Sequence, residues 1–348
     1  MKKLLLLGYI CILSSCKTSY DAHKSNFTTV KIDTLLQGKF SIRALTIQDH
    51  HVYFGADNCR IGYVDLTQTN RNSFISIDTL KSEFRSIASN GTSIFVLNVA
   101  NPAKLFKVSK DFKIIETVYN ETHEKVFFDS MQFWNSKEGI AIGDPINACF
   151  NVIITRDGGS SWTKINCDKL PLLEEGEAAF AASNTNIIIK NNKTWIVSGG
   201  KKSRVLYSSD KGLTWEVHQT PIIEGKTMTG IFTGDFYNES IGIISGGDYE
   251  KPNQNFQNKA ITHDGGKNWK LIAENQGFGY ASCIQFVPQS KGQELVCVGA
   301  NGMFYSADEG EHWKQVSTDP DLYTIRFIDR KTAIAAGKNK IIRIKFIP

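Results

Sequence analysis

The stretch Thr262-His263-Asp264-Gly265-Gly266-Lys267-Asn268-Trp269 carries a spacing, S/T-x-D-x-G-x-x-W, that occurs four times in the chain. The other copies span residues 155–162, 208–215 and 306–313. Each copy follows a β-branched or apolar run and precedes a second short strand-like run, so each is predicted to form the turn of a β-hairpin. The repeat therefore predicts a β-rich chain built from similar units.

Three positions of the repeat have separate physical reasons. The Asp side chain can accept hydrogen bonds from backbone N–H groups of its own turn. The Gly adopts positive φ without steric cost, and the Trp can bury its ring while its N–H is hydrogen-bonded. These reasons assign the repeat a structural role, with ligand binding by the Asp as the alternative. The residues are Asp157, Gly159, Trp162, Asp210, Gly212, Trp215, Asp264, Gly266, Trp269, Asp308, Gly310 and Trp313.

The distances between copies indicate the architecture. The intervals Trp162 to Trp215, Trp215 to Trp269 and Trp269 to Trp313 are 53, 54 and 44 residues. Self-similarity at such a period indicates a solenoid, propeller or array, and this period suits one four-stranded propeller blade with its loops. The prediction is an all-β fold, a seven-bladed β-propeller of four-stranded antiparallel blades, over residues 28–348.

The two ends of the chain predict how the ring closes. Residues 28–35 alternate apolar and polar side chains as a lone strand does, and no hairpin partner lies nearby. The tail holds three strand-like runs, at 323–327, 332–337 and 341–346. A seventh blade thus lacks its outer strand. Residues 28–35 are predicted to supply it beside 341–346, which removes exposed sheet edges.

The turn motif matches the Asp-box, or bacterial neuraminidase repeat, found in sialidases and in many non-catalytic propellers. Further stretches resemble signature segments of bacterial propellers related to the photosystem II stability and assembly factor: residues 128–129, 143–145, 176–183 and 246–249. This resemblance covers almost the whole mature chain. It implies seven blades and, in photosynthetic members, binding of a membrane protein during assembly. Relatives often carry an oxidoreductase label, but the chain has no G-x-G-x-x-G after a strand and no flavin or haem signature, so no cofactor is predicted.

The N-terminus is predicted to be an export signal. Lys2-Lys3 precede an apolar run from Leu4 to Leu13 that is too short to span a bilayer as a mature helix. The run ends in Leu13-Ser14-Ser15-Cys16, which resembles the bacterial lipobox. We therefore expect a lipoprotein signal peptide at 1–15, lipid on Cys16 and a polar tether at 16–27. A plain secretory signal with an incidental Cys is the alternative.

This reading places the protein in the bacterial envelope, held by its lipid. Residues 17–19 lack the acidic cluster that marks surface export in some bacteria, which favours a periplasm-facing anchor. The formal charge of +5, which falls to +3 without Lys2 and Lys3, is spread without a basic block, so no nucleic-acid partner is predicted.

An exported chain can oxidise its cysteines. Cys149 and Cys167 lie nearly symmetrically about the turn at Asp157, so they are predicted to form a disulfide. The states of the remaining cysteines stay open at this point. No pair has C-x-x-C spacing, so neither a zinc site nor a redox motif is indicated. The remaining cysteines of the mature chain are Cys59, Cys283 and Cys297.

Candidate site residues come from the first strand of each blade, which lines the central channel of a propeller. Alignment of these strands puts charged residues of several blades at one position. Arginine pairs suit carboxylate or phosphate groups through bidentate hydrogen bonds, and mutual pairing of the charges is the alternative. The residues at or near this position are Arg43, Arg85, Asp129, Glu177 and Tyr323.

Two further acids follow other strands. Asp144 and Asp248 each come after a Gly that allows a close approach of backbone, so both are candidate ligand-binding residues. No third ligand is identifiable beside them, and no metal site is predicted.

The preferred hypothesis is a non-catalytic, monomeric, lipid-anchored propeller that binds an envelope protein or glycan through its charged channel face, in an assembly or scaffold role. The alternative is a sialidase-like glycoside hydrolase or a glycan-binding propeller. A sialidase needs a Tyr nucleophile, an acid and three arginines. Arg43 and Arg85 supply two, Ala281 occupies the third position, and the Phe/Tyr-Arg-Ile-Pro motif is absent.

Overall fold

The computed structural model describes residues 27–68, 71–77 and 82–348. The predicted signal peptide, Cys16 and all of the tether except its last residue lie outside these ranges. Within them the chain is all-β apart from one short 3-10 helix, η1 (Cys167–Lys169). No helix in the described part is long and apolar enough to cross a membrane.

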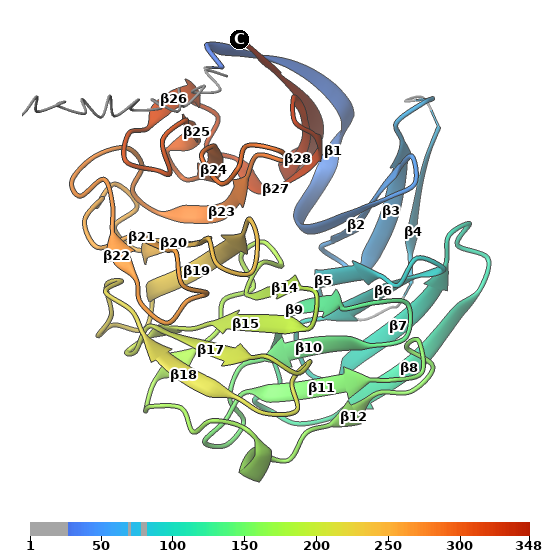
Figure 1. The fold of residues 1–348 in the computed structure, drawn as a ribbon. Coiled ribbons are helices and arrows are strands. Elements are labelled where there is room, and N and C mark those ends of the chain that lie inside the picture. The colour runs from blue at the N-terminus through green and yellow to red at the C-terminus, as the bar shows by residue number, and fades with distance from the viewer. Residues whose placement is uncertain (1–26, 69–70, 78–81) are drawn as a thin grey trace, which may run out of the picture.

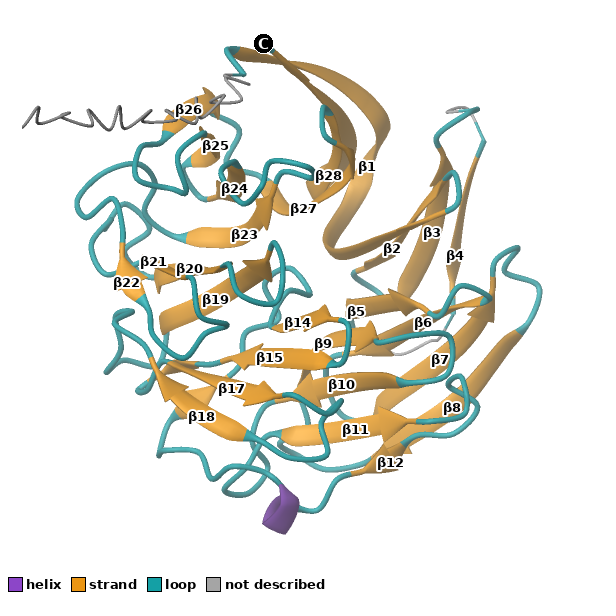
Figure 2. Cartoon of the chain, in the orientation of Figure 1, coloured by secondary structure: helices purple, strands orange, loops and turns teal. Residues whose placement is uncertain are grey.

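The strands form antiparallel sheets that surround a common centre, as in a β-propeller (Figures 1 and 2). Four sheets have four strands each. They are β5 (Phe84–Ser89), β6 (Ser93–Asn98), β7 (Ala103–Ser109) and β8 (Ile115–Glu121); β9 (Phe128–Phe133), β10 (Gly139–Gly143), β11 (Asn151–Thr155) and β12 (Thr163–Lys164); β14 (Ile187–Lys190), β15 (Lys193–Val197), β17 (Arg204–Ser208) and β18 (Glu216–Gln219); β23 (Ala281–Phe286), β24 (Leu295–Gly299), β25 (Gly302–Ser306) and β26 (Lys314–Ser317).

The other two sheets have six strands each. In spatial order they are β27 (Leu322–Asp329), β28 (Thr332–Ile347), β1 (Thr29–Gln48), β2 (His51–Ala56), β3 (Arg60–Asp65) and β4 (Asn72–Ser76); and β13 (Glu177–Ala178), β16 (Gly199–Gly200), β19 (Thr229–Phe236), β20 (Gly242–Asp248), β21 (Lys259–Thr262) and β22 (Lys270–Leu271).

The described residues thus form six sheets, where the sequence predicted seven separate blades. Long strands at the two ends of the chain account for the difference. β1 has 20 residues and pairs first with β28 and then, from Ile42, with β2. The N-terminal strand lies beside the C-terminal one as predicted, with Val30 opposite Phe346 and Thr34 opposite Ile342. This continuous hydrogen bonding joins the first and last units of the ring into one sheet.

The hydrophobic core is divided among the interfaces between neighbouring sheets. One cluster joins β23–β25 to β27 and β28 through buried residues such as Val296, Ile325 and Ile344. Another joins β15 and β17 to β19 and β20, where the ring of Trp195 stacks on Phe236 with centroids 3.8 Å apart. Burial of apolar area between successive sheets therefore holds the ring together.

The four repeated turns share one hydrogen-bond pattern, shown here for the copy between β21 and β22. Asp264 Oδ1 accepts from the N–H of Asn268 (3.0 Å) and from Thr262 Oγ1 (2.8 Å), while Thr262 Oγ1 accepts from the N–H of Gly266 (3.0 Å). Gly266 has φ +90°. The indole N–H of Trp269 donates to the Gly266 carbonyl (2.9 Å). Each fixed position of the motif therefore contributes to the structure of the turn in which it lies.

The copy between β11 and β12 departs from this pattern at one atom. Asp157 accepts from the N–H and hydroxyl of Ser161 (3.0 and 2.6 Å). Trp162 is buried against Phe95 and Phe133, and its indole N–H has no hydrogen-bond partner among the described residues. The expectation of a bonded indole fails for this copy, whose ring is buried while those of Trp215, Trp269 and Trp313 stay half-buried.

Cys149 and Cys167 are joined by a disulfide, with Cα atoms 5.7 Å apart. The bond links the start of the β11 hairpin to the beginning of η1. Cys283 and Cys297 are buried free thiols on the paired strands β23 and β24, and Cys59 is buried in another cluster.

Candidate binding site in the central channel

The centre of the ring is crossed by an irregular segment between β13 and β14, residues 182–186, which we call the plug. Its side chains are buried, and Asn184 has φ +58°. Hydrogen bonds tie it to inner strands from around the ring: Arg43 Nη1 to Ala182 O (3.3 Å), Asn184 Nδ2 to Ile87 O (2.8 Å), Met131 N to Asn184 Oδ1 (2.9 Å), Thr185 Oγ1 to Thr233 Oγ1 (2.8 Å), Ser183 Oγ to Ser282 O (2.6 Å) and Thr324 Oγ1 to Ser183 O (3.2 Å). The plug therefore fills the channel at this level.

Two adjoining cavities lie beside the start of this segment, where Ala182 lines the first of them, and together we call them the channel cavity. The first encloses about 370 Å³ and the second about 310 Å³, and they share Arg43, Tyr249 and Tyr280. Backbone and side chains of residues 178–182 line the first. Concave sites of this size suit a side chain or a short segment of a ligand.

The structure brings together most of the residues that the sequence proposed for this site. Arg43, Arg85, Asp129 and Asp144 line the first cavity, and Arg43 with Tyr323 lines the second. They come from β1, β5, β9, the end of β10 and β27, which are far apart in sequence. The alignment of inner strands thus predicted a real spatial cluster.

Glu177 does not belong to this cluster, so its placement at the channel was wrong. Its carboxylate is fully buried and pairs with Arg204, whose Nε and Nη2 donate at 3.1 and 2.5 Å. Ser198 Oγ and the N–H of Glu174 also donate to it. The two-residue strand β13 turns this side chain into the sheet, where it has no access to a ligand.

Asp248 is also excluded from the cavity lining. Its side chain is 2 % exposed and accepts from the N–H groups of Glu250 (3.0 Å) and Lys251 (3.2 Å), with Lys226 Nζ at 3.6 Å. This carboxylate builds the turn after β20. The next residue, Tyr249, lines both cavities instead.

Asp129 and Asp144 form a close pair of carboxyl groups with raised pKa values. Burial is the main cause for both, and the charge of Asp144 raises the pKa of Asp129 further, while Arg85 opposes the shift. The pKa of Asp144 is raised to about 6, against one hydrogen bond from the N–H of Ala179 (3.0 Å). Neither oxygen of Asp129 has a hydrogen bond of good geometry among the described residues, but the backbone N–H groups of Ala181 and Asp144 lie close enough to oppose the rise of its pKa.

A close backbone approach positions Asp144, as the preceding glycine predicted. A Cβ on Gly143 would lie 2.2 Å from the carbonyl oxygen of Phe127, so only glycine fits there. The chain can then bring Asp144 beside Asp129 at the cavity.

The two arginines differ in their surroundings. Arg85 Nε donates to Glu83 (2.7 Å), which neutralises it locally. The guanidinium of Arg43 lies 4.3 Å above the ring of Tyr323 and donates to the plug. Among the described residues, no carboxylate lies within 4.0 Å of Arg43, so its charge is available to a ligand.

The sequence reasoning missed an aromatic wall of the cavity. Phe180 stacks on Phe232 with centroids 3.9 Å apart, Tyr280 meets Phe232 edge-on at 4.8 Å, and Tyr249 meets Tyr280 edge-on at 5.1 Å. Tyr249 is 46 % exposed. The sequence offered one indication of this wall, because Tyr249 directly follows Asp248 in the segment 246–249 that carries the resemblance.

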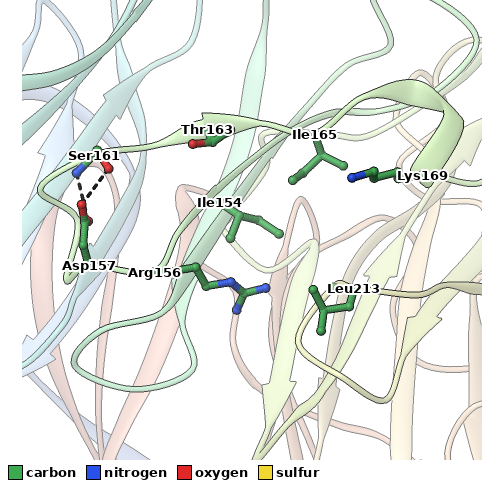
Figure 3. A pocket seen from close by; sticks show the side chains of 9 residues that line it. Ile154, Arg156, Asp157, Ser161, Thr163, Ile165, Lys169 and Leu213 are labelled. Atoms are coloured by element: carbon green, nitrogen blue, oxygen red, sulfur yellow. Dashed lines mark hydrogen bonds between the residues drawn. The ribbon is translucent and has the colours of Figure 1, made fainter.

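A separate pocket of about 350 Å³ lies at the rim beside the β11–β12 turn, and Figure 3 shows its lining. Two of its charged groups have partners in the fold, since Arg156 pairs with Glu138 (2.8 Å) and Asp157 accepts from Ser161, whereas Lys169 is exposed at its edge. The exposed Leu213 faces it from the next repeated turn. No aromatic ring is stacked on the charge of Lys169 among the described residues, unlike the guanidinium of Arg43 over Tyr323.

No group of three or more His, Cys, Asp or Glu side chains in the described ranges is arranged to hold a metal ion.

Comparison with known proteins supports the fold. No family model matches the sequence, and no curated protein matches it. Similar solved structures include "YCF48 bound to D1 peptide" (TM-score 0.63, 13 % identity, 93 % of this chain and 98 % of that chain). YCF48 from Cyanidioschyzon merolae gives a TM-score of 0.64 at 12 % identity, over 92 % and 99 % of the two chains. The WD40 propeller domain of Doa1 gives 0.62 at 11 % identity, over 90 % and 96 %. At these identities the likeness shows a β-propeller fold.

Proposed function

We propose that this protein is a binding propeller that recognises an acidic group of a partner protein at the channel cavity, without turnover. The observation that carries the proposal is Arg43: a guanidinium held over Tyr323 at a cavity, with no carboxylate of the described chain paired to it. Arginine offers bidentate hydrogen bonds to a carboxylate, and partial desolvation strengthens them. Arg85 lines the first cavity as well, with its Nε bound to Glu83.

Two further observations favour a peptide partner. Tyr249 and Tyr323 expose aromatic surface beside Arg43, and aromatic and arginine side chains dominate the energetics of protein interfaces. A propeller of similar fold, YCF48, has been solved with a D1 peptide bound. The shared fold supports a protein partner here and leaves its identity open.

We also propose that the protein acts in the bacterial envelope, anchored by lipid on Cys16. The lipobox-like tetrapeptide before Cys16 and the charged start at Lys2-Lys3 support this. Replacement of Cys16 by Ala should move the protein from the membrane to the soluble periplasmic fraction. Retention of the variant in the membrane fraction would contradict lipidation.

The six sheets are best understood as seven blade units closed by the N-terminal strand. The end of β28 lies beside its own start, because Phe346 N–H donates to Lys331 O (2.8 Å), and Asn339 between them has φ +65°. β28 therefore folds back as a hairpin, which with β27 and residues 29–37 supplies four strands. The turns at 155–162, 208–215, 262–269 and 306–313 fit the Asp-box pattern in this scheme.

The test of partner binding uses Arg43→Ala and the double variant Arg43→Ala/Arg85→Ala as baits in pull-downs from envelope membranes. A partner retained by the wild type should be lost from both, more completely from the double variant. Lys251→Ala, which removes an exposed positive charge outside the cavity, is the matched control and should retain it. Equal retention by all baits, with an unchanged melting temperature, would refute the proposal.

The glycosidase alternative is separated by an assay on sialosides and other acidic glycosides. We expect no turnover. Hydrolysis that disappears in Arg43→Ala would replace binding with catalysis as the function.

A further inference from the structure

The proposed function uses the arginines and leaves the carboxyl pair of the channel cavity without a role. Asp129 is fully buried and lines the cavity, and neither of its oxygens has a hydrogen bond of good geometry among the described residues, although the backbone N–H groups of Ala181 and Asp144 lie near it. A buried carboxyl whose hydrogen bonds are incomplete costs free energy, which a purely structural channel avoids by using a neutral residue. This cost indicates that the site is completed by something else.

The arginines near the carboxyl pair are engaged elsewhere. Arg85 from β5 faces it but is bound to Glu83, and Arg43 from β1 lies over Tyr323 in the adjoining cavity. The segment 178–182 packed against the pair carries no charged side chain. The remaining titratable groups of the cavity are Tyr249 and Tyr280, and burial raises the pKa of Tyr280 so that it stays neutral at physiological pH.

One carboxylate oxygen is open to a ligand. Asp144 is partly exposed, and its Oδ1 accepts from the Ala179 N–H, which is the one hydrogen bond to its side chain recorded within the described chain. Its Oδ2 therefore keeps acceptor capacity at the cavity. Asp129 is fully buried, so Asp144 is the carboxyl that a ligand can contact.

The rest of the first cavity is apolar. Phe180, Phe232, Phe127 and Met228 line it together with the alanines of residues 178–182. Such walls accept methylene groups, and aromatic faces attract cations. A ligand with an alkyl stem and a cationic tip can pack its stem on the apolar walls and place its charge at the carboxylate of Asp144.

We propose that the Asp129–Asp144 end of the channel cavity binds a primary alkylammonium group, as on a lysine side chain, with Asp144 as direct acceptor and the stem against Phe180 and Phe232. This ammonium subsite goes beyond the proposed recognition of an acidic group at Arg43 and does not depend on it. A partner that carries a basic and an acidic residue close together would engage both ends.

The experiment titrates the full chain at pH 7.5 with Nα-acetyl-lysine methylamide, which has no carboxylate, and follows binding by NMR chemical shifts. Nα-acetyl-norleucine methylamide, with the same stem and no charge, is the matched ligand. We expect saturable binding of the lysine derivative with a Kd in roughly the millimolar range, and at least about tenfold weaker binding of the norleucine derivative.

Variants locate the binding. Asp144→Asn keeps the size of the side chain and should weaken binding of the lysine derivative by about tenfold or more. Glu311→Gln, which removes an acid from an exposed repeated turn, should leave binding unchanged. Arg43→Ala should bind the lysine derivative at least as well as the wild type. Asp144→Asn therefore tests the ammonium subsite and Arg43→Ala tests the recognition of an acidic group, so either proposal can fail without the other.

The dependence on pH is a second readout. Asp144 must be ionised to accept an ammonium, and its pKa is about 6. Affinity should therefore fall as the pH is lowered from 7.5 through 6, while the ammonium stays charged. Equal binding of the lysine and norleucine derivatives, or binding that is unaffected by Asp144→Asn, would overturn the proposal.

Discussion

Aspartates occupy two contrasting environments in this molecule: the repeated turns at the outer hairpins and the cavity at the centre. In the turns each carboxylate accepts several hydrogen bonds, and these lower its pKa, to about 2 for Asp157 and Asp264. In the cavity, burial without enough donors raises the pKa of Asp129 and Asp144. The surroundings of the turns therefore stabilise an ionised aspartate, and those of the cavity destabilise it.

The difference shows how a structural acid can be told from a candidate binding residue. An acid whose acceptor capacity is filled by its own chain has little left for a ligand. Glu177 belongs with the turn aspartates in this respect, since Arg204, Ser198 and the Glu174 N–H satisfy it. Its charge and its position along the chain had suggested a free carboxylate at the channel.

The largest expected effect is on Glu177. Glu177→Gln leaves Arg204 buried without its counter-charge, and loss of one member of a buried pair costs about 3–5 kcal/mol. Chemical denaturation should show this loss in the free energy of unfolding, with partner capture unchanged in the folded fraction. Glu177→Leu/Arg204→Leu should recover part of the stability. If Glu177→Gln is as stable as the wild type, an acid whose oxygens are hydrogen-bonded within its own chain need not contribute to stability, and the comparison fails.

A smaller loss is expected in a repeated turn. Asp264→Ala removes hydrogen bonds to Asn268 and Thr262 at a largely exposed site, which should cost about 1–2 kcal/mol. Because the folded pKa is depressed, this contribution is present above pH 4 and is lost as the pH falls towards 2. The difference in unfolding free energy between variant and wild type should shrink over that range. Asp308→Ala, in another copy, should behave in the same way.

The smallest effect should have the opposite sign. Asp129→Asn removes a buried carboxyl whose folded pKa is raised, so the wild type loses stability as the pH rises above about 4 and the variant avoids that loss. At pH 7.5 the variant should be more stable by about 1 kcal/mol. Thermal unfolding across pH 4 to 8 tests this slope. A lower melting temperature for Asp129→Asn at every pH would place Asp129 with the turn aspartates.

The sequence predicted the parts of the fold that depend on local chemistry. The S/T-x-D-x-G-x-x-W turns and the strands beside them follow from short-range hydrogen bonds that residue types reveal. The pairing of Val30 with Phe346 followed from counting strands at the two ends. Convergence of Arg43, Arg85 and Asp129 followed from the repeat, because equivalent positions of a ring must face one centre.

Tertiary detail was beyond such reasoning. The plug interrupts the regular inner strand of one unit, and its hydrogen bonds involve residues that are as much as 143 positions apart. The rotation of Glu177 into its sheet depends on Arg204, 27 residues later. The merging of the first and last units depends on the continuous length of β1, which no local pattern specifies.

The plug sets a topological limit on what this protein can hold. Because residues 182–186 fill the centre of the ring at their level, a guest bound in the channel cavity beside them cannot pass through the ring there. A chain end, the apex of a loop or a single protruding side chain can insert, but a polymer cannot be threaded through the ring. Release of such a guest therefore needs no opening of the ring.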